Sequence, residues 1–347
     1  MMTSMQRVLT AMAQKEPDRV PLFLLTTMHG AKELGLTIRD YFSRAENVAE
    51  GQLRLLAKYR SDCLYTATYA SVEHEAFGGE TIFIDDGPPN AGGAVIHNYE
   101  DIDRLMPPRI AESAGLMRGL ETIRLLKARV GDTVPIVGSV ISPFSLPVMQ
   151  LGFGPYLELI YQQPERFARL LDVNQAFCAE WANAQLAAGA TAIGYADPLA
   201  STTNIPRELY LNTGHRVAVE TLARINGPTA IHLASGRGLG IVEDIVATGA
   251  TAVGVSALED LADWKAAVKG RLTLLGNLNG VEMRRWTAAQ AESEVKRAIA
   301  KAARGGGFVL ADNHGEIPWQ VPEAVLLAIR EAVDRWGNYP LDWVADA

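Results

Sequence analysis

Residues 305–323 read GGGFVLADNHGEIPWQVPE, and this stretch contains one complete strand-to-helix transition. An apolar run from Phe308 to Leu310 has the character of a buried strand, and a segment with helical periodicity begins at Pro322. Between them stand two acids, an amide and an imidazole: Asp312, Asn313, His314 and Glu316. A buried strand that ends in polar groups and leads into a helix is the repeating unit of a parallel α/β fold.

The same unit recurs along the chain. Short apolar, β-branched runs predict eight strands: Val20 to Leu25, Cys63 to Tyr69, Thr133 to Val140, Ala190 to Asp197, Thr229 to Ala234, Ala252 to Ala257, Leu272 to Leu278 and Phe308 to Asp312. Helical periodicity appears at Pro206 to Ile225, Gly240 to Thr248, Leu258 to Val268, Thr287 to Ala303 and Pro322 to Trp336. This alternation favours an α/β fold, a (β/α)8 or TIM barrel.

About 250 residues suffice for such a barrel, so a chain of 347 residues has room for N-terminal and mid-chain insertions. The longest excursions are Phe83 to Arg104, which has room for a hairpin, and the helical region Ser142 to Ala188. We expect one domain over residues 1–347. A doubly wound sheet is the rival fold, but the first strand lacks the GxGxxG turn typical of a cofactor-binding sheet.

Composition excludes several classes of protein. Hydrophobic residues at 48% and charged residues at 21% indicate a globular protein with a large core. A net charge of -8 without a basic cluster argues against nucleic-acid binding. No apolar run approaches the length of a membrane span and no secretory signal is visible, so a soluble cytoplasmic protein is expected. Cys63 and Cys178 lie far apart and are expected to be buried thiols.

In a barrel of this kind the chemistry lies at the carboxyl ends of the strands. The polar residues at or just beyond those ends predict an enzyme site: His29, Tyr69, Glu73, Ser139, Asp197, His232, Ser256, Asn277, Asp312, His314 and Glu316. Asp197 and Asn277 also suit turns. His232 and His314 could bind metal, donate a proton or anchor an anion, or each could simply bond a neighbouring loop. His97 and His215 are expected to be surface or packing residues.

The order and spacing of six stretches resemble the uroporphyrinogen decarboxylase superfamily. They are PDRVPLF, DCLYTATYASVEHEAFGG, VGSVISPFSL, IGYADPLAS, LLGNLNG and NHGEIPWQVPEAVLLAIREAV. The superfamily contains the haem-pathway decarboxylase and corrinoid-dependent methyltransferases on a (β/α)8 barrel, and the resemblance covers almost the whole chain. It also suggests a homodimer.

Within the superfamily, the residues favour the methyltransferase branch. The decarboxylase's catalytic Asp falls on Tyr69, and LLTTMHGAKELG lacks the Arg residues that hold that enzyme's carboxylate-rich substrate. Methyltransferases that act on a thiol hold zinc through His-x-Cys and a later Cys. The corresponding positions here are His232, Ala234 and His314, so both thiolates are missing.

The resemblance therefore implies a methyltransferase that moves a methyl group from a small O-methyl (or N-methyl) donor to the Co(I) of a corrinoid protein. Zinc bound by His232, His314 and Glu316 would be a harder Lewis acid than a thiolate site and suited to an ether oxygen. The expected catalytic residues are His232, His314, Asp197 and Tyr69, and the expected substrate contacts are His29, Glu73, Ser139, Asn277 and Ser256. A decarboxylase and a non-catalytic corrinoid-binding accessory protein are the alternatives.

Overall fold

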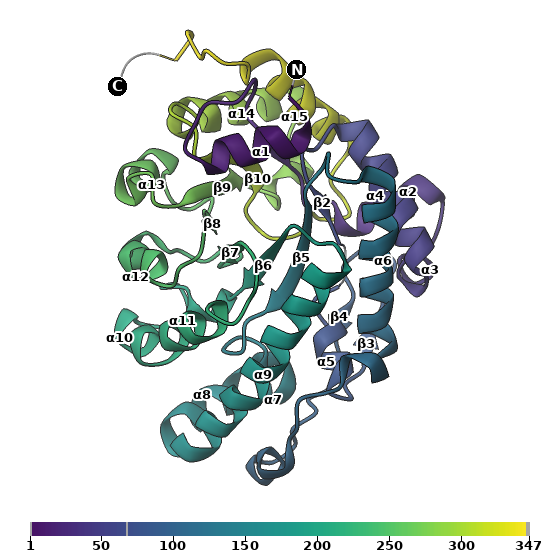
Figure 1. Ribbon diagram of the computed structural model, residues 1–347, viewed down its shortest axis with the longest axis vertical. Helices are drawn as coiled ribbons and strands as arrows, with labels where there is room; N and C mark the ends of the chain where they lie inside the picture. Colours follow the sequence, from purple (N-terminus) through teal and green to yellow (C-terminus); the bar gives the residue numbers. More distant parts are fainter. Residues whose placement is uncertain (1, 67–68, 345–347) are drawn as a thin grey trace.

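Eight parallel strands form a nearly closed barrel in the computed structural model, which describes residues 2–66 and 69–344 (Figure 1). Their order is β1-β10-β9-β8-β7-β6-β5-β2. The strands are β1 (Leu22–Phe23), β2 (Leu64–Tyr65), β5 (Ile136–Ile141), β6 (Ala192–Ala196), β7 (Thr229–His232), β8 (Ala252–Gly254), β9 (Thr273–Leu278) and β10 (Phe308–Asp312). The predicted (β/α)8 barrel is confirmed. Ala67 and Thr68 of the second predicted strand lie outside the described residues.

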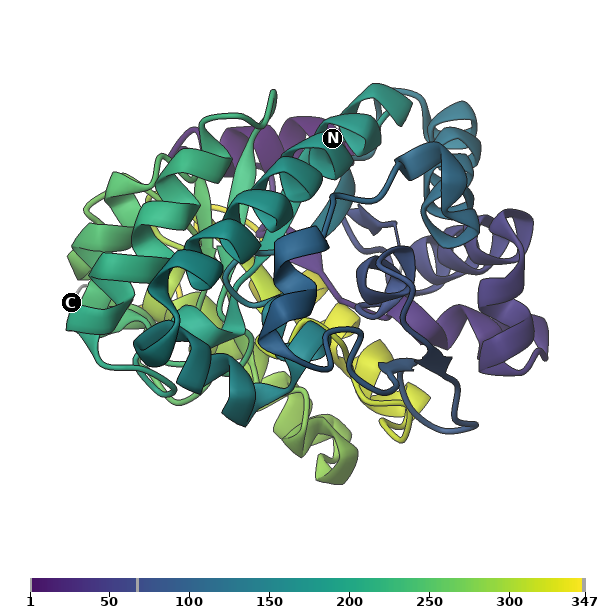
Figure 2. The same cartoon turned by 90° about the horizontal axis from the view of Figure 1, so that it is seen from below.

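Helices fill the connections and surround the strands. They are α1 (Ser4–Met12), α2 (Gly30–Leu34), α3 (Ile38–Ser43), α4 (Ala45–Tyr59), α5 (Val72–Ala76), α6 (Ala114–Val130), α7 (Pro147–Leu151), α8 (Phe153–Gln162), α9 (Pro164–Ala188), α10 (Arg207–Tyr210), α11 (Arg216–Leu222), α12 (Val242–Ala247), α13 (Leu261–Val268), α14 (Ala288–Ala302) and α15 (Glu323–Trp336). Figure 2 shows the purple and blue helices of residues 30–130 on one side and the green ones on the other. No helix in the described ranges is both long and apolar enough to cross a membrane.

Helix boundaries follow local chemistry. The side chain of Thr287 accepts the backbone N–H of Gln290 and the Gln290 side chain accepts the Thr287 N–H, which is a capping box at the start of α14. The single helix expected from Pro206 to Ile225 is instead α10 and α11, joined by one π-helical turn at Leu211–His215.

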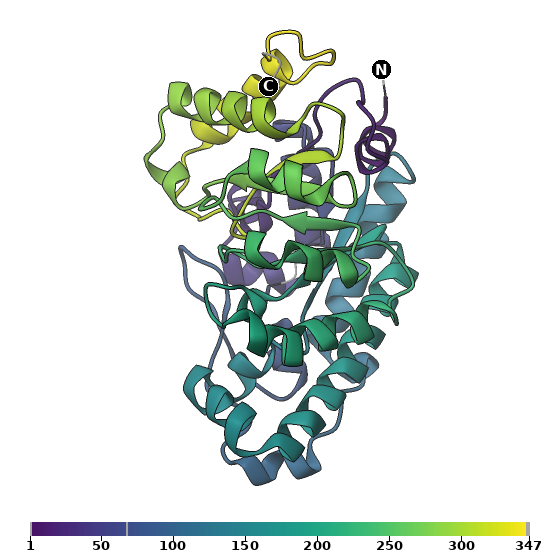
Figure 3. The ribbon, with the colours of Figure 1, turned by 90° about the vertical axis from the view of Figure 1, so that its left-hand side faces the viewer.

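The two insertions extend the molecule away from the barrel. A short antiparallel hairpin joins β3 (Thr81–Ile82) to β4 (Asn90–Ala91), so it begins just before the predicted excursion. The region from Ser142 to Ala188 contains α7, α8 and the long helix α9. Both insertions lie at the end of the long axis opposite the two chain termini (Figure 3).

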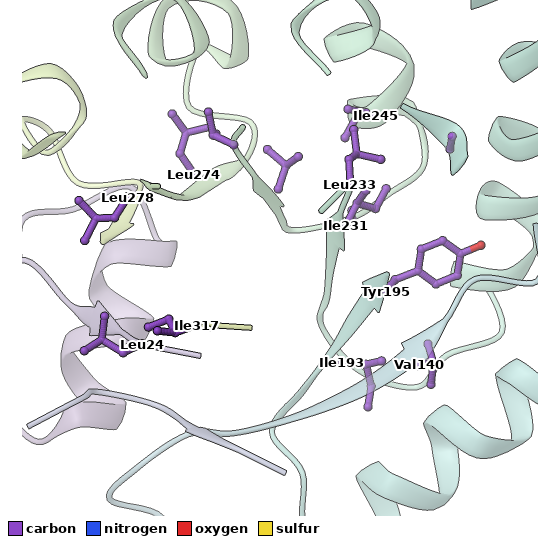
Figure 4. Packing of buried hydrophobic residues seen from close by; sticks show 14 of the residues in the cluster. Leu24, Val140, Ile193, Tyr195, Ile231, Leu233, Ile245, Leu274, Leu278 and Ile317 are labelled. Carbon is purple, nitrogen blue, oxygen red and sulfur yellow. The ribbon is translucent and has the colours of Figure 1, made fainter. Parts of the chain in front are cut away.

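Alternating side chains on the strands divide the barrel into a packed outer layer and an open interior. Val140, Ile193 and Tyr195 are fully buried in the large hydrophobic cluster, together with the other side chains of Figure 4. Gly194 and Ala196, the neighbours of opposite orientation on β6, line an internal cavity instead. Small residues on the inner face of the strands therefore leave space inside the barrel.

A buried group of charged residues closes the seam between β1 and β2. The Asp62 backbone N–H donates to Leu22 O at 2.6 Å, and its carboxylate accepts the Leu22 N–H at 2.9 Å. The same carboxylate pairs with Arg7 at 2.6 Å and Arg19 at 2.8 Å, and Asp18 pairs with Arg7 at 2.6 Å. We call Arg7, Asp18, Arg19 and Asp62 the closure network.

Candidate active site

A cavity of about 240 Å³ lies inside the barrel, bounded by strand ends and the loops that follow them. It brings together seven of the residues that the sequence singled out: Tyr69, Glu73, Ser139, His232, Asp312, His314 and Glu316. They come from β5, β7, β10, α5 and the adjoining loops. Most of the remaining wall is apolar or aromatic, so the few polar groups are held in a largely dry environment.

The bottom of this cavity is a thin layer of side chains. Phe23, Val137, Ala230 and Leu275 line it and also line a second, apolar cavity of about 100 Å³ on the other side. We call these four residues the barrel floor. The second cavity is bounded by residues of α1, among them Met5, Val8 and Met12, so it lies toward the N-terminal helix.

Glu73 is a deeply buried acid of the cavity wall. The side chain is 3% exposed, and its Oε1 accepts the backbone N–H of Ile141 at 2.9 Å. Its Oε2 is buried and has no hydrogen-bond partner among the described residues. Burial raises the pKa of Glu73 to about 8, against the smaller opposing effect of the Ile141 N–H. Glu73 is therefore a neutral carboxylic acid near pH 7.

Asp312 and Glu316 are acids of a different kind. Asp312 accepts the backbone N–H groups of Leu25 and His314, each at 3.2 Å. Burial raises the pKa of Asp312 to about 6. Glu316 accepts the hydroxyl of Thr27, and burial, together with the nearby Asp312 charge, raises its pKa to about 7. Asp312 therefore has two backbone donors to hold its charged form, whereas Glu316 and Glu73 have one donor each.

His232 presents a defined tautomer to the cavity. The Ala234 backbone N–H donates to His232 Nδ1 at 3.0 Å, so in the neutral ring the proton is on Nε2. Burial, and then the neighbouring His314, lowers the pKa of His232 to about 4. The ring packs close to Gly254 and Gly315, where a Cβ would lie 2.9 Å and 3.2 Å from its atoms. His232 is thus a neutral N–H donor.

His314 is held by a chain of hydrogen bonds that starts outside the cavity. Asn277 donates to Ser256 O at 3.0 Å, Ser256 Oγ donates to Ser235 O at 2.9 Å, and Ser235 Oγ bonds His314 Nδ1. Burial lowers the pKa of His314. Asn277 and Ser256, which were expected to contact substrate, lie outside the cavity lining and support the loop that holds His314.

Asp197 and His29 also lie outside the cavity wall. Asp197 is 2% exposed and accepts the hydroxyls of Ser142 and Ser145, each at 2.6 Å, while burial raises its pKa to about 6. His29 is 3% exposed, and its ring lies 6.0 Å from that of Trp319. Burial, and then the charge of Lys32, lowers the pKa of His29 to about 3. These positions suit support of loops better than direct contact.

Tyr69 contributes its ring to the wall, but its hydroxyl is engaged elsewhere. The hydroxyl donates to Glu75 Oε2 at 2.8 Å and accepts from Arg118 Nη2 at 3.1 Å. Two further wall residues, Tyr65 and Thr27, were not singled out by the sequence. Tyr65 is the third residue of the predicted strand Cys63 to Tyr69, so it faces the same side of the strand as Tyr69. Strict alternation along that strand was the signal that could have found it.

The donor set does not fit the expected zinc site. Within the described ranges, no three His, Cys, Asp or Glu side chains are grouped so that they could hold a metal ion. The lone pair of His232 Nδ1 already accepts the Ala234 N–H, so its Nε2 carries hydrogen and offers no lone pair to a metal. Glu316 is bonded to Thr27. These residues are therefore assigned hydrogen-bonding roles and no metal-binding role.

Comparison with known proteins gives two kinds of relative. The pattern of the family described as Uroporphyrinogen decarboxylase (URO-D) matches residues 3–336. The chain is 27% identical over 337 residues to a uroporphyrinogen decarboxylase of Methylococcus capsulatus, covering 91% of this chain and 93% of the relative. It is 25% identical over 343 residues to the methylcobamide:CoM methyltransferase MtaA of Methanosarcina barkeri, covering 94% and 96%.

Solved structures agree on the fold. A methyltransferase from Methanosarcina mazei superposes with a TM-score of 0.82 at 21% identity, covering 96% of this chain and 99% of the other. A B12-independent methionine synthase from Shewanella gives a TM-score of 0.56 at 14% identity, covering 86% and 89%. At these identities the likeness concerns architecture alone.

Proposed function

The chain belongs to the uroporphyrinogen decarboxylase family, and we propose that it is a methyltransferase of that family. It would transfer a methyl group from a small O-methyl or N-methyl donor to the Co(I) of a corrinoid carried by a partner protein. The similarity to a methylcobamide:CoM methyltransferase over most of both chains supports this branch. The chain matches a decarboxylase about equally well, so the residues of the site have to distinguish between a methyltransferase and a decarboxylase.

The charge of the cavity is the observation that carries the proposal. Among the described residues the lining contains carboxyl groups but no Lys or Arg. A substrate with several carboxylates needs fixed cations for charge-assisted hydrogen bonds, and buried unpaired acids would oppose its binding. A cavity of about 240 Å³ with an apolar, aromatic wall supports a small methylated compound instead.

The residues of the wall would act by orientation and by hydrogen bonding. Co(I) is itself the nucleophile, so the protein has to align the donor's methyl group with the corrinoid and stabilise the leaving atom. His232 offers a neutral Nε2–H for this purpose, and the Ala234 N–H fixes that tautomer. Asp312, Ser139 and His314 would position the donor, while the ring of Tyr69 packs against it.

A two-product assay tests this function. The purified protein is incubated with cob(I)alamin, as a surrogate for the corrinoid protein, and with methyl ethers or N-methyl amines, and methylcobalamin is measured by its absorbance. A parallel reaction offers a polycarboxylate tetrapyrrole and measures CO2. We expect methyl transfer without CO2 release. Release of CO2 that does not need the corrinoid would establish the decarboxylase instead, and no turnover of either kind would favour an accessory protein.

The His232→Ala variant, which has no side-chain N–H, tests the assigned donor. Loss of one preorganised hydrogen-bond donor at a reacting centre lowers kcat by roughly 10²–10³-fold. Elemental analysis of wild type and variant accompanies the assay, with substoichiometric zinc expected in both. One zinc per chain in wild type that disappears in His232→Ala would return this residue to a metal-binding role.

A further inference from the structure

The cavity wall contains one acid whose hydrogen bonding is incomplete. Glu73 is 3% exposed, and its buried Oε2 lacks a partner among the described residues, although Oε1 is held by Ile141 N–H at 2.9 Å. A buried polar atom without a partner destabilises the folded state. Glu73 belongs to the residues that line the cavity, so a ligand bound there is the available source of a partner for this carboxyl group.

We propose that Glu73 delivers the proton to the leaving oxygen during methyl transfer, and that uncharged O-methyl compounds are therefore the substrates. This inference rests on the proposed methyltransferase function and deepens it. It gives Glu73, which the sequence predicted as a substrate contact, a catalytic role. It also favours O-methyl donors over N-methyl donors.

The hydrogen bonds decide where the acid proton resides. Since the Ile141 N–H must meet a lone pair, Oε1 is the carbonyl-type oxygen and the proton of neutral Glu73 is on Oε2. That O–H has no acceptor in the described protein, so an ether or alkoxide oxygen is a suitable one. In Asp312, by contrast, each oxygen accepts a backbone N–H. Of the cavity acids, only Glu73 combines a buried position with an unpartnered oxygen.

The surroundings keep Glu73 neutral. Tyr65 on β2 and Cys178 on α9 are the titratable groups beside it, and burial raises the pKa of both, that of Tyr65 to about 12. His74 and Glu75, on the same helix, are bonded to Gly93 O and to Tyr69 instead. The other titratable groups of the wall are His232, Asp312, His314 and Glu316. None supplies a positive charge near neutral pH, so the burial that raises the Glu73 pKa to about 8 is not offset.

The step balances without a further reactant. The electron pair of Co(I) forms the Co–CH3 bond as the C–O bond breaks, and the pair of the C–O bond stays on the oxygen. That oxygen takes the Oε2 proton of Glu73, so the product leaves as a neutral alcohol or phenol. The Glu73 carboxylate then regains a proton from water. An N-methylammonium donor leaves as a neutral amine and needs no such proton.

A series of aryl methyl ethers of graded leaving-group acidity tests the role, with cob(I)alamin as acceptor. In Glu73→Gln, kcat/KM should fall by about 10²–10⁴-fold for electron-rich ethers, and by far less for nitro-substituted ones, whose phenolates leave without protonation. The variant's rate should thus depend more steeply on leaving-group pKa than the wild-type rate. The matched control is Glu75→Gln on the same helix, outside the cavity lining, for which the dependence should equal that of wild type.

A second measurement does not depend on turnover. The infrared difference spectrum between wild type and Glu73→Gln at pH 7 should contain the C=O stretch of a carboxylic acid, and a carboxylate band in its place would overturn the proposal. Equal losses for every ether, or no loss, in an active enzyme would overturn the role of Glu73 alone. Faster turnover of tetramethylammonium than of any ether would overturn the substrate class. Absence of methyl transfer by wild type would overturn the proposed function itself.

Discussion

Two buried acids in different regions of this barrel, Asp62 and Glu73, have opposite surroundings. Asp62 of the closure network is fully buried, and two arginines and a backbone N–H occupy its oxygens. Glu73 in the cavity is almost as buried, but the cavity lining provides no cation and one of its oxygens lacks a partner in the described protein. A buried carboxylate with full compensation fixes structure, whereas a buried acid without it has protons and hydrogen bonds to offer a substrate.

The largest effect is expected from breaking the closure network. Asp62→Ala leaves Arg7 and Arg19 buried without their shared partner, which should lower the free energy of unfolding by about 3–5 kcal/mol. Urea unfolding followed by circular dichroism measures the loss. The control is Asp334→Ala, which removes a half-exposed pair with Arg60 and should cost about 1 kcal/mol or less. Equal losses in both variants would mean that burial of the pair is irrelevant.

A smaller loss of stability, but a loss of activity, is expected on the cavity side. In Gly254→Ala the added Cβ would lie 2.9 Å from the His232 ring, so the ring has to move. Such overpacking costs about 1–3 kcal/mol, and displacement of the Nε2–H donor should lower kcat/KM for methyl transfer. Gly154→Ala on α8 is the control, because nothing lies within 4 Å of its added Cβ. Unchanged kcat/KM in Gly254→Ala would argue against a positioned His232.

A third effect, the smallest when it is counted per pH unit, concerns pH and distinguishes the two kinds of acid directly. The unfolded chain loses the Glu73 proton near pH 4.5, while the folded protein keeps it to about pH 8. The folded state therefore binds the extra proton between these values, and stability should fall as pH rises through this window, by less than about 1.4 kcal/mol per pH unit. Asp312 and Glu316, with pKa values of about 6 and 7, act in the same direction.

Melting temperatures at several pH values between 5 and 8 measure this slope in wild type and in Glu73→Gln. The variant has no proton to lose at this position, so its decline with pH should be shallower. Parallel curves for the two proteins would show that Glu73 is ionised in the folded state.

The sequence predicted the barrel well because periodicity and turn residues are local signals. The start of α14 at Thr287 and the strand Phe308–Asp312 follow directly from such patterns. The position of a polar residue at a strand end, however, does not say whether its side chain faces the interior. Glu73 follows the end of β2 and Asn277 is the penultimate residue of β9, yet of these two only Glu73 lines the cavity, because Asn277 donates to the loop carbonyls of Ser256 and Glu259.

Contacts between residues far apart in the sequence could not be predicted from local patterns. Thr27 donates a hydrogen bond to Glu316, and Arg7 donates one to Asp62, because the folded barrel brings these distant segments together. The same holds for the tautomer of His232, which depends on one backbone N–H two residues away and on a loop conformation that no periodicity encodes. The sequence could therefore propose the members of the site, but it could not assign their protonation.

The barrel floor has a consequence for how this site could change its substrate. Among the described residues, Phe23, Val137, Ala230 and Leu275 are the ones that line both the candidate active-site cavity and the apolar cavity beneath it. Shortening Phe23 or Leu275 would join the two spaces and deepen the site along the barrel axis. No acid or imidazole of the wall belongs to this layer. The depth of the cavity and the polar groups of its wall can therefore be altered independently, by different residues.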